Sequence, residues 1–148
     1  MKIGLHMIVA GDPSPVIPCI ESQSGLCDCG VILVDSKSDS DDLYSALINM
    51  NIPHLAIRRY VWESSFARAR NTALEKLLLN FPNIDYVYWV DGDDIWAPGT
   101  NLSDLREKLE KEQPEAVNLL YQYSSTAKLY RNRIWKVING EVPYFWRG

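Results

Sequence analysis

The sequence predicts an α/β fold with a mostly parallel, twisted sheet and helices on both faces. Short apolar runs alternate with segments of helical periodicity, which is typical of βαβ units. One run, residues 86–90, is apolar or aromatic at every position, as strands buried on both faces are. No internal repeat, low-complexity tract or long linker interrupts the alternation. We therefore expect a single domain over residues 1–148.

The first half of the chain predicts three strands and two helices. The second of these helices has an acidic first turn, which favours a helix N-terminus. In chain order we expect a strand at 2–9, a short helix at 14–22, a strand at 31–34, a helix at 40–50 and a strand at 54–57.

The second half continues the same rhythm. We expect a helix at 65–79, a strand from 84 to 90, a helix at 101–112, a strand at 116–120 and a final hairpin at 126–137.

Composition excludes several classes of function. The chain has 148 residues, of which 47% are hydrophobic and 23% charged, as in ordinary soluble domains. Because the net charge is -4, nucleic acid is not an expected partner. The apolar runs are strand-sized, so we expect no transmembrane segment, no secretory signal and a cytoplasmic location.

The most informative segment is residues 84–96, IDYVYWVDGDDIW. Asp91, Asp93 and Asp94 surround Gly92 where the buried strand leaves the sheet, and open α/β sheets bind ligands at that end of their strands. An Asp-x-Asp pair supplies the hard oxygen ligands that suit Mg²⁺ or Mn²⁺, which can hold nucleotide phosphates. The alternative is a solvated acidic turn. In either case, the mutual repulsion of three carboxylates calls for positive charge nearby.

Arg70 is the first candidate for that charge. It falls on the apolar stripe of the helix at 65–79, where a guanidinium needs a partner, while Arg68 lies on the opposite, solvent-facing side. The partner is either a nearby acid or a bound diphosphate, and the two options are compatible. The stripe itself consists of Phe66, Ala69, Ala73, Leu74 and Leu77.

The loop DSKSDSDD, residues 35–42, provides further candidates. Asp35 ends the second strand and can accept hydrogen bonds from a base or a ribose hydroxyl. Asp39 is a second candidate contact to the nucleotide sugar. For Ser38, Asp39 and Ser40, the alternative is capping of the following helix.

Taken in order, four motifs resemble those of the family 2 glycosyltransferases, which are inverting enzymes of the GT-A fold with nucleotide-sugar donors. They are IGLHMIVAGD, VILVDSKSDSDD, VWESSFARARNTALEK and YWVDGDD, and together they span about residues 2–96. The resemblance implies that Asp35 contacts the uracil or ribose, that Asp91 lies near the nucleotide and that Arg70 helps to anchor this arrangement. It also implies that Asp93, with Asp91 beside it, holds the Mn²⁺ or Mg²⁺ that bridges the diphosphate.

The resemblance further implies transfer of a sugar from a nucleotide-diphosphate donor of the UDP class to an unknown acceptor. Because relatives usually continue into acceptor-binding elements, it also implies that the domain over residues 1–148 is minimal or truncated at its C-terminus. Relatives often carry a late Gly-x-x-His-Glu pattern that supplies a carboxylate base, but this chain has Gly140 and Glu141 followed by Val142, without the His-Glu pair. Glu141 remains as a candidate base. The alternative is a noncatalytic nucleotide-sugar binding module. A nucleotidyltransferase-like enzyme is a third interpretation, but AGDPSPVIP lacks the basic Gly-rich loop expected of one.

Two other features admit structural explanations. We interpret His6, within the first strand, as a hydrogen-bonded core histidine. The late aromatic residues are candidates for stacking on an acceptor sugar, or for the core or a subunit contact. They are Trp135, Tyr144, Phe145 and Trp146.

Overall fold

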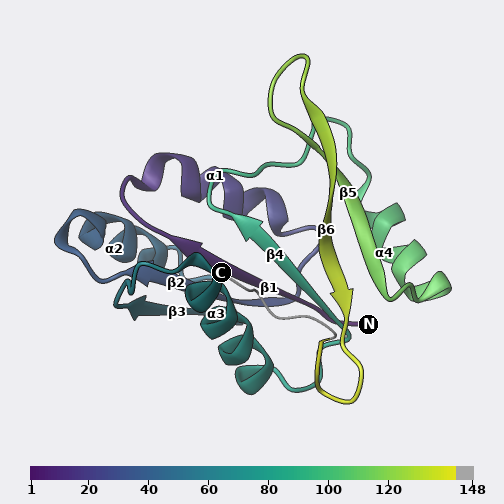
Figure 1. Cartoon of the computed structure of the whole chain (residues 1–148), viewed down its shortest axis with the longest axis horizontal. Coiled ribbons are helices and arrows are strands. Elements are labelled where there is room, and N and C mark those ends of the chain that lie inside the picture. The colour runs from purple at the N-terminus through teal and green to yellow at the C-terminus, as the bar shows by residue number, and fades with distance from the viewer. Residues whose placement is uncertain (143–148) are drawn as a thin grey trace.

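A computed structural model describes residues 1–142 and contains one six-stranded sheet with helices on both faces (Figure 1). The strand order is β3-β2-β1-β4-β6-β5. The strands are β1 (Ile3–Val9), β2 (Cys29–Asp35), β3 (Leu55–Tyr60), β4 (Tyr86–Asp91), β5 (Ala116–Gln122) and β6 (Lys128–Lys136). The helices are α1 (Pro13–Gln23), the 3₁₀ turn η1 (Ser38–Ser40), α2 (Asp41–Asn49), α3 (Phe66–Asn80) and α4 (Leu102–Glu112).

The sheet has a parallel and an antiparallel part. Strands β3, β2, β1 and β4 are mutually parallel, whereas β6 is antiparallel to both β4 and β5. The carboxyl ends of the four parallel strands therefore meet at one edge, and the acidic segment follows β4 at that edge. The predicted fold class is confirmed.

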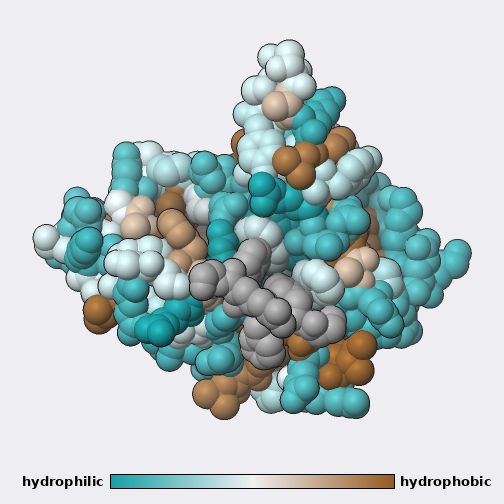
Figure 2. Space-filling model, in the orientation of Figure 1, coloured by the Kyte–Doolittle hydropathy of each residue, from teal (hydrophilic) through white to brown (hydrophobic). Residues whose placement is uncertain are grey.

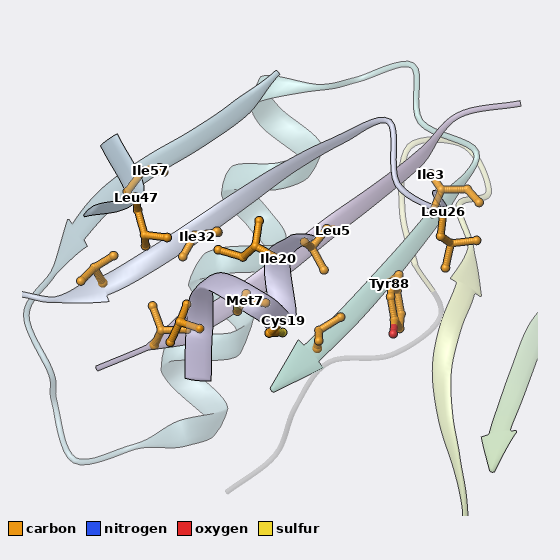
Figure 3. Close-up of a cluster of buried hydrophobic side chains, with 14 of the residues drawn as sticks. Ile3, Leu5, Met7, Cys19, Ile20, Leu26, Ile32, Leu47, Ile57 and Tyr88 are labelled. Atoms are coloured by element: carbon orange, nitrogen blue, oxygen red, sulfur yellow. The ribbon is translucent and has the colours of Figure 1, made fainter. Parts of the chain in front are cut away.

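Two apolar clusters hold the layers together. The larger one joins α1, α2 and α4 to one face of the sheet, and Figure 3 shows its side chains from β1, β2, α1 and α2 pointing toward one another. The smaller cluster joins α3 to the other face through Ala73, Leu74 and Leu77. Because β4 has an apolar cluster on each side, its first five residues are buried, as the continuous apolar run predicts.

Side-chain caps fix where three helices begin. In each case the side-chain oxygen of a residue just before the helix accepts a hydrogen bond from a backbone N–H of the first turn, which would otherwise lack an intrahelical partner. The caps are Asp12 for α1 through Ser14, Ser65 for α3 through Arg68, and Asn101 for α4 through Asp104.

Two sequence-based expectations were wrong. Residues 126–137 do not form a hairpin by themselves, because the hairpin consists of β5 and β6, which extend further than expected. Phe66 is not part of the core stripe of α3 but is 67% exposed. It is the first residue of the helix, and its ring meets the edge of Trp62 outside the core, with centroids 4.8 Å apart.

The surface is mostly hydrophilic on the face that Figure 2 shows, with apolar residues in separate spots and the β5–β6 hairpin standing out from the body. Within residues 1–142, no helix combines the length and apolar character needed to cross a membrane.

His6 is buried between Val31 and Trp89 of the neighbouring strands, but its Nε2 atom has no hydrogen-bond partner within the described chain. The expectation of a hydrogen-bonded histidine is therefore wrong for this nitrogen. Burial, together with the charge of Arg70, lowers the pKa of His6 to about 3.

This pKa predicts a specific loss of stability in acid. The unfolded chain protonates His6 near pH 6.5, whereas the folded chain keeps it neutral down to about pH 3. The stability of the folded state that depends on a neutral His6 is therefore fully present above pH 6.5 and is lost as the pH falls toward 3. Relative to His6→Leu, the protein should lose up to about 1.4 kcal/mol of unfolding free energy per pH unit in this range. Urea unfolding of both proteins at several pH values measures it, and parallel curves would refute a neutral buried His6.

Candidate active site

Asp91, at the carboxyl edge of the sheet, pairs with two arginines. Its Oδ1 accepts from Nη2 of Arg70 at 2.6 Å, and its Oδ2 pairs with Nη2 of Arg133 at 3.3 Å. The two arginines come from α3 and β6, so one side chain ties a helix and the antiparallel part of the sheet to β4. The predicted partner for Arg70 is thus an acid of the DGDD segment.

Asp94 turns back toward the protein. Its Oδ2 accepts from the backbone N–H of Asp91 at 3.1 Å and pairs with Nη1 of Arg133 at 3.3 Å, while its Oδ1 accepts from the Tyr121 hydroxyl. Burial raises the pKa of Asp94, and the Tyr121 hydrogen bond and the Arg133 charge oppose that rise. Asp94 is a structural acid of the loop.

Asp93 differs from both neighbours because it is exposed and its carboxylate makes no hydrogen bond or ion pair within residues 1–142. The described residues contain no cluster of three His, Cys, Asp or Glu side chains that forms a complete metal cage. Any ion held here would need oxygens from a ligand in addition to Asp93.

Gly92 is explained by packing inside the protein. A Cβ atom at this position would lie 2.9 Å from Cγ1 of Val9 and 3.5 Å from Cγ2 of Val16. The acidic turn therefore passes closely over the end of β1 and the start of α1, and a larger residue would displace it.

Arg133 is the functional candidate that sequence reasoning missed. It is 3% exposed, and its guanidinium lies 3.6 Å from the centroid of the Trp89 ring and 4.9 Å from that of Tyr121. Arg70 lies over the same Trp89 ring at 4.5 Å. The available signal was the need of three carboxylates for more positive charge than Arg70 alone supplies.

Asp35 lines a cavity of about 270 Å³ over the carboxyl ends of β1, β2 and β3. Its Oδ1 accepts from the N–H of Lys37 at 3.3 Å, and the cavity also contains Trp62, Phe66 and Tyr60. The Tyr60 hydroxyl is buried without a partner in the described part of the chain. A flat apolar wall with a polar group in need of a partner suits an aromatic, hydrogen-bonding ligand.

Asp39 is exposed and does not line this cavity. The capping alternative does not hold for this loop either, since neither Lys37 before η1 nor Ser40 before α2 makes a side-chain cap hydrogen bond. The Ser40 hydroxyl instead accepts from the N–H of Gly11 at 2.9 Å, which ties the turns after β1 and β2 together.

A second cavity, of about 610 Å³, lies between the DGDD segment and the β5–β6 hairpin. Asp93 and Asp94 line one side, and aromatic residues line much of the rest. Trp96 is held in place because its Nε1 donates to Oε1 of Gln23 at 2.8 Å. The aromatic lining residues are Tyr88, Trp96, Tyr121 and Tyr123.

The structure does not bring Glu141 to this edge. Lys136 of β6 pairs with Tyr86 at the start of β4, so the segment after β6 lies at the opposite end of the sheet from the DGDD turn (Figure 1). Glu141 is exposed there and bridges to Ile138. Trp135 packs against the α3-side cluster and belongs to the core, while Tyr144, Phe145 and Trp146 lie outside the described residues.

A comparison with protein families shows to which family this chain belongs. The model of the family described as Glycosyl transferase family 2 matches residues 14–147, nearly the whole chain. The chain belongs to glycosyl transferase family 2. No curated protein sequence matches this chain significantly.

Solved structures resemble this family 2 chain in fold. The crystal structure of S. aureus TarS 1-349 matches with a TM-score of 0.60 and 16% sequence identity, and the match covers 78% of this chain and 34% of the TarS chain. The structure of TarS 1-349 in complex with UDP matches with a TM-score of 0.62 and 15% identity, covering 86% of this chain and 37% of the TarS chain. The chain thus spans about a third of TarS 1-349. The structure of a 4-diphosphocytidyl-2C-methyl-D-erythritol synthase matches with a TM-score of 0.55 and 13% sequence identity, covering 92% of this chain and 74% of the synthase chain. The likeness to TarS confirms the predicted GT-A fold.

The two arginines of α3 should contribute very differently to stability. Arg70→Met removes a guanidinium that is only 15% exposed and bonded to Asp91. The free energy of unfolding should fall by about 1–3 kcal/mol, because Asp91 then keeps only Arg133 among its described partners. Arg68→Met removes a pair with Glu63 that is 68% exposed on the arginine side, which should cost less than about 0.5 kcal/mol. Urea unfolding measures both, and equal costs would contradict the assigned faces of α3.

Proposed function

We propose that this family 2 chain binds a nucleoside-diphosphate sugar, of the UDP class, at the DGDD edge and transfers the sugar to an acceptor with the help of a divalent ion. The observation that carries the proposal is the state of Asp93. Among the described residues it is the one carboxylate of the DGDD turn that has no partner, and it lines a cavity at the ligand-binding edge of the sheet.

The cavity over β1, β2 and β3 suits the base and ribose of the donor. Asp35 can accept from a base N–H or a ribose hydroxyl, and the unpartnered Tyr60 hydroxyl offers a further hydrogen bond. Trp62 and Phe66 supply the apolar wall for a flat base. That one TarS structure is a complex with UDP supports the choice of nucleotide.

A divalent ion fits these residues when the donor completes its coordination. Mg²⁺ in nucleotide sites commonly uses one or two carboxylates together with phosphate oxygens and water, and Asp93 supplies one such carboxylate. Asp91 is the second candidate ligand for the ion, but both of its carboxylate oxygens already pair with arginines. Once bound, the ion would neutralise the charge that develops on the departing diphosphate.

The reaction we propose is a direct displacement. An acceptor hydroxyl oxygen attacks the anomeric carbon while the bond from that carbon to the diphosphate oxygen breaks, and the bonding electrons leave with the nucleoside diphosphate. The configuration at the anomeric carbon is thereby inverted. We assign the acceptor to the cavity beside Asp93, and its four aromatic rings support this assignment because they suit the apolar faces of a carbohydrate. The hydroxyl proton requires a base, to which the described residues assign no side chain.

The second candidate function, a noncatalytic donor-binding module, is favoured by the position of Glu141. This side chain lies at the far end of the sheet, and Asp94, the other acid of the acceptor cavity, is already paired. Incubation with UDP-glucose and Mn²⁺ separates the two functions. Release of UDP supports the transferase, whereas donor binding without any release supports the module.

Asp93→Asn should abolish the Mn²⁺-dependent part of UDP binding, because the variant loses the carboxylate of the turn that is unpaired within residues 1–142. The free energy of unfolding should stay within about 0.5 kcal/mol, since the side chain is exposed and makes no hydrogen bond or ion pair with those residues. Isothermal titration with UDP, with and without Mn²⁺, measures the first effect, and urea unfolding the second.

Glu141→Gln and Arg68→Ala are the matched controls. Both residues are exposed and remote from the contacts of Asp91, so Mn²⁺-dependent UDP binding should survive in both variants. If either control lost that binding to the same extent as Asp93→Asn, the proposed donor site would be in the wrong place.

A further inference from the structure

Arg133 occupies a special position in β6. Val117 of β5 pairs with Ile134, but the next residue, Asn118, pairs with Asn132, so Arg133 is the extra residue of a β-bulge. The bulge is held from the other side by Trp89, whose Nε1 donates to the carbonyl of Asn132 at 2.9 Å. Bulges next to active sites commonly re-aim one side chain, and this one directs a guanidinium at the DGDD turn.

The Arg133 guanidinium is placed to hold two carboxylates at once. It is buried between the rings of Trp89 and Tyr121, and its two terminal nitrogens pair with Oδ2 of Asp91 and Oδ2 of Asp94. A planar fork with fixed N–H directions suits this arrangement better than the compact charge of a lysine ammonium.

The consequence is a charge balance that disfavours a bare cation. Asp91, Asp93 and Asp94 carry three negative charges, and Arg70 and Arg133 carry two positive ones, so one negative charge remains. A divalent ion that approached without nucleotide would find one free carboxylate, Asp93, and two nearby guanidinium groups that repel it. A diphosphate adds negative charge and oxygen ligands, and so removes both obstacles.

We propose that Arg133 makes binding of the divalent ion depend on prior or simultaneous binding of the nucleotide diphosphate, by keeping Asp91 and Asp94 out of the coordination sphere. The inference rests on the proposed function, because it concerns the same ion and donor. Arg133 is a positioning residue in this scheme, since it acts through the two aspartates and touches neither ion nor donor.

The test is a gain of function. Arg133→Met should remove the guanidinium partner of Asp94 Oδ2 and of Asp91 Oδ2, while Asp94 keeps its hydrogen bonds from the Asp91 N–H and the Tyr121 hydroxyl and Asp91 keeps its pair with Arg70. With one positive charge fewer and two oxygens without an arginine, the affinity for the ion without nucleotide should rise about tenfold. Titration with Mn²⁺ alone, followed by the loss of the free-ion electron paramagnetic resonance signal, measures this affinity. The increase in ion affinity that UDP produces should shrink correspondingly, and Mn²⁺ alone should raise the Tm of the variant more than that of the protein. A merely structural role for Arg133 predicts weaker binding in every condition.

Two further variants identify the source of the gain. Arg133→Met combined with Asp94→Asn should lose the gained affinity, because Asp94 is the acid that Arg133 releases. Arg131→Met is the matched control: it removes the same charge from the same strand, but Arg131 bonds the Tyr123 hydroxyl at 2.5 Å and pairs with no carboxylate among the described residues. It should leave the affinity for Mn²⁺ alone unchanged.

If Arg133→Met does not fold, Arg133→Lys is the second variant, because lysine keeps the charge but lacks the planar fork that orients both acids. A smaller gain in Mn²⁺ affinity of the same sign is expected. Unchanged or weaker binding of Mn²⁺ alone in the folded variants would overturn the inference, even where the unaltered protein binds UDP with Mn²⁺. Absence of Mn²⁺-dependent UDP binding in the unaltered protein would instead overturn the proposed function.

Discussion

The ion pairs of Asp91 are the interaction on which the rest of this edge depends. Asp91 ends β4, and its two oxygens are shared between Arg70 of α3 and Arg133 of β6. The pairs join the parallel half of the sheet to the antiparallel half at the point where a ligand would bind. Because both guanidinium groups are largely buried, losing their shared carboxylate would leave costly unpaired charges. The acidic turn is thereby fixed in the conformation that exposes Asp93.

Much of this arrangement could be predicted from residue patterns. The apolar run of β4 implied burial on both faces and therefore placed the aspartates at a sheet edge. The helical spacing around Arg70 put a guanidinium on the buried side of α3, where only an acid or a ligand can offset it. Asp35 followed from the same rule about strand ends, and it does line a cavity there. Periodicity is sufficient for such assignments because it depends on local geometry alone.

Other features depend on contacts that no local pattern encodes. The role of Arg133 arises from one extra residue in β6, and simple alternation along a strand does not reveal a bulge. Tyr121 lies 27 residues after Asp94 in the sequence. The two meet only because β5 pairs with β6 and β6 pairs with β4. Residue type makes Glu141 a candidate base, but the antiparallel direction of β6 carries it to the opposite end of the sheet. Phe66 matched the core spacing, yet as the first residue of α3 it lies beyond the sheet face that the helix covers.

The central claim is that Asp93 alone among the three aspartates is available to a metal-bound diphosphate. A crystal structure of the protein with UDP and Mn²⁺, with the ion located by its anomalous scattering, tests this most directly. The account predicts an ion about 2.1–2.2 Å from an Asp93 oxygen, phosphate oxygens completing its shell, and Asp91 still paired with both arginines. An ion coordinated by Asp91 and Asp94 with those pairs broken, or a nucleotide bound away from Asp35, would contradict it.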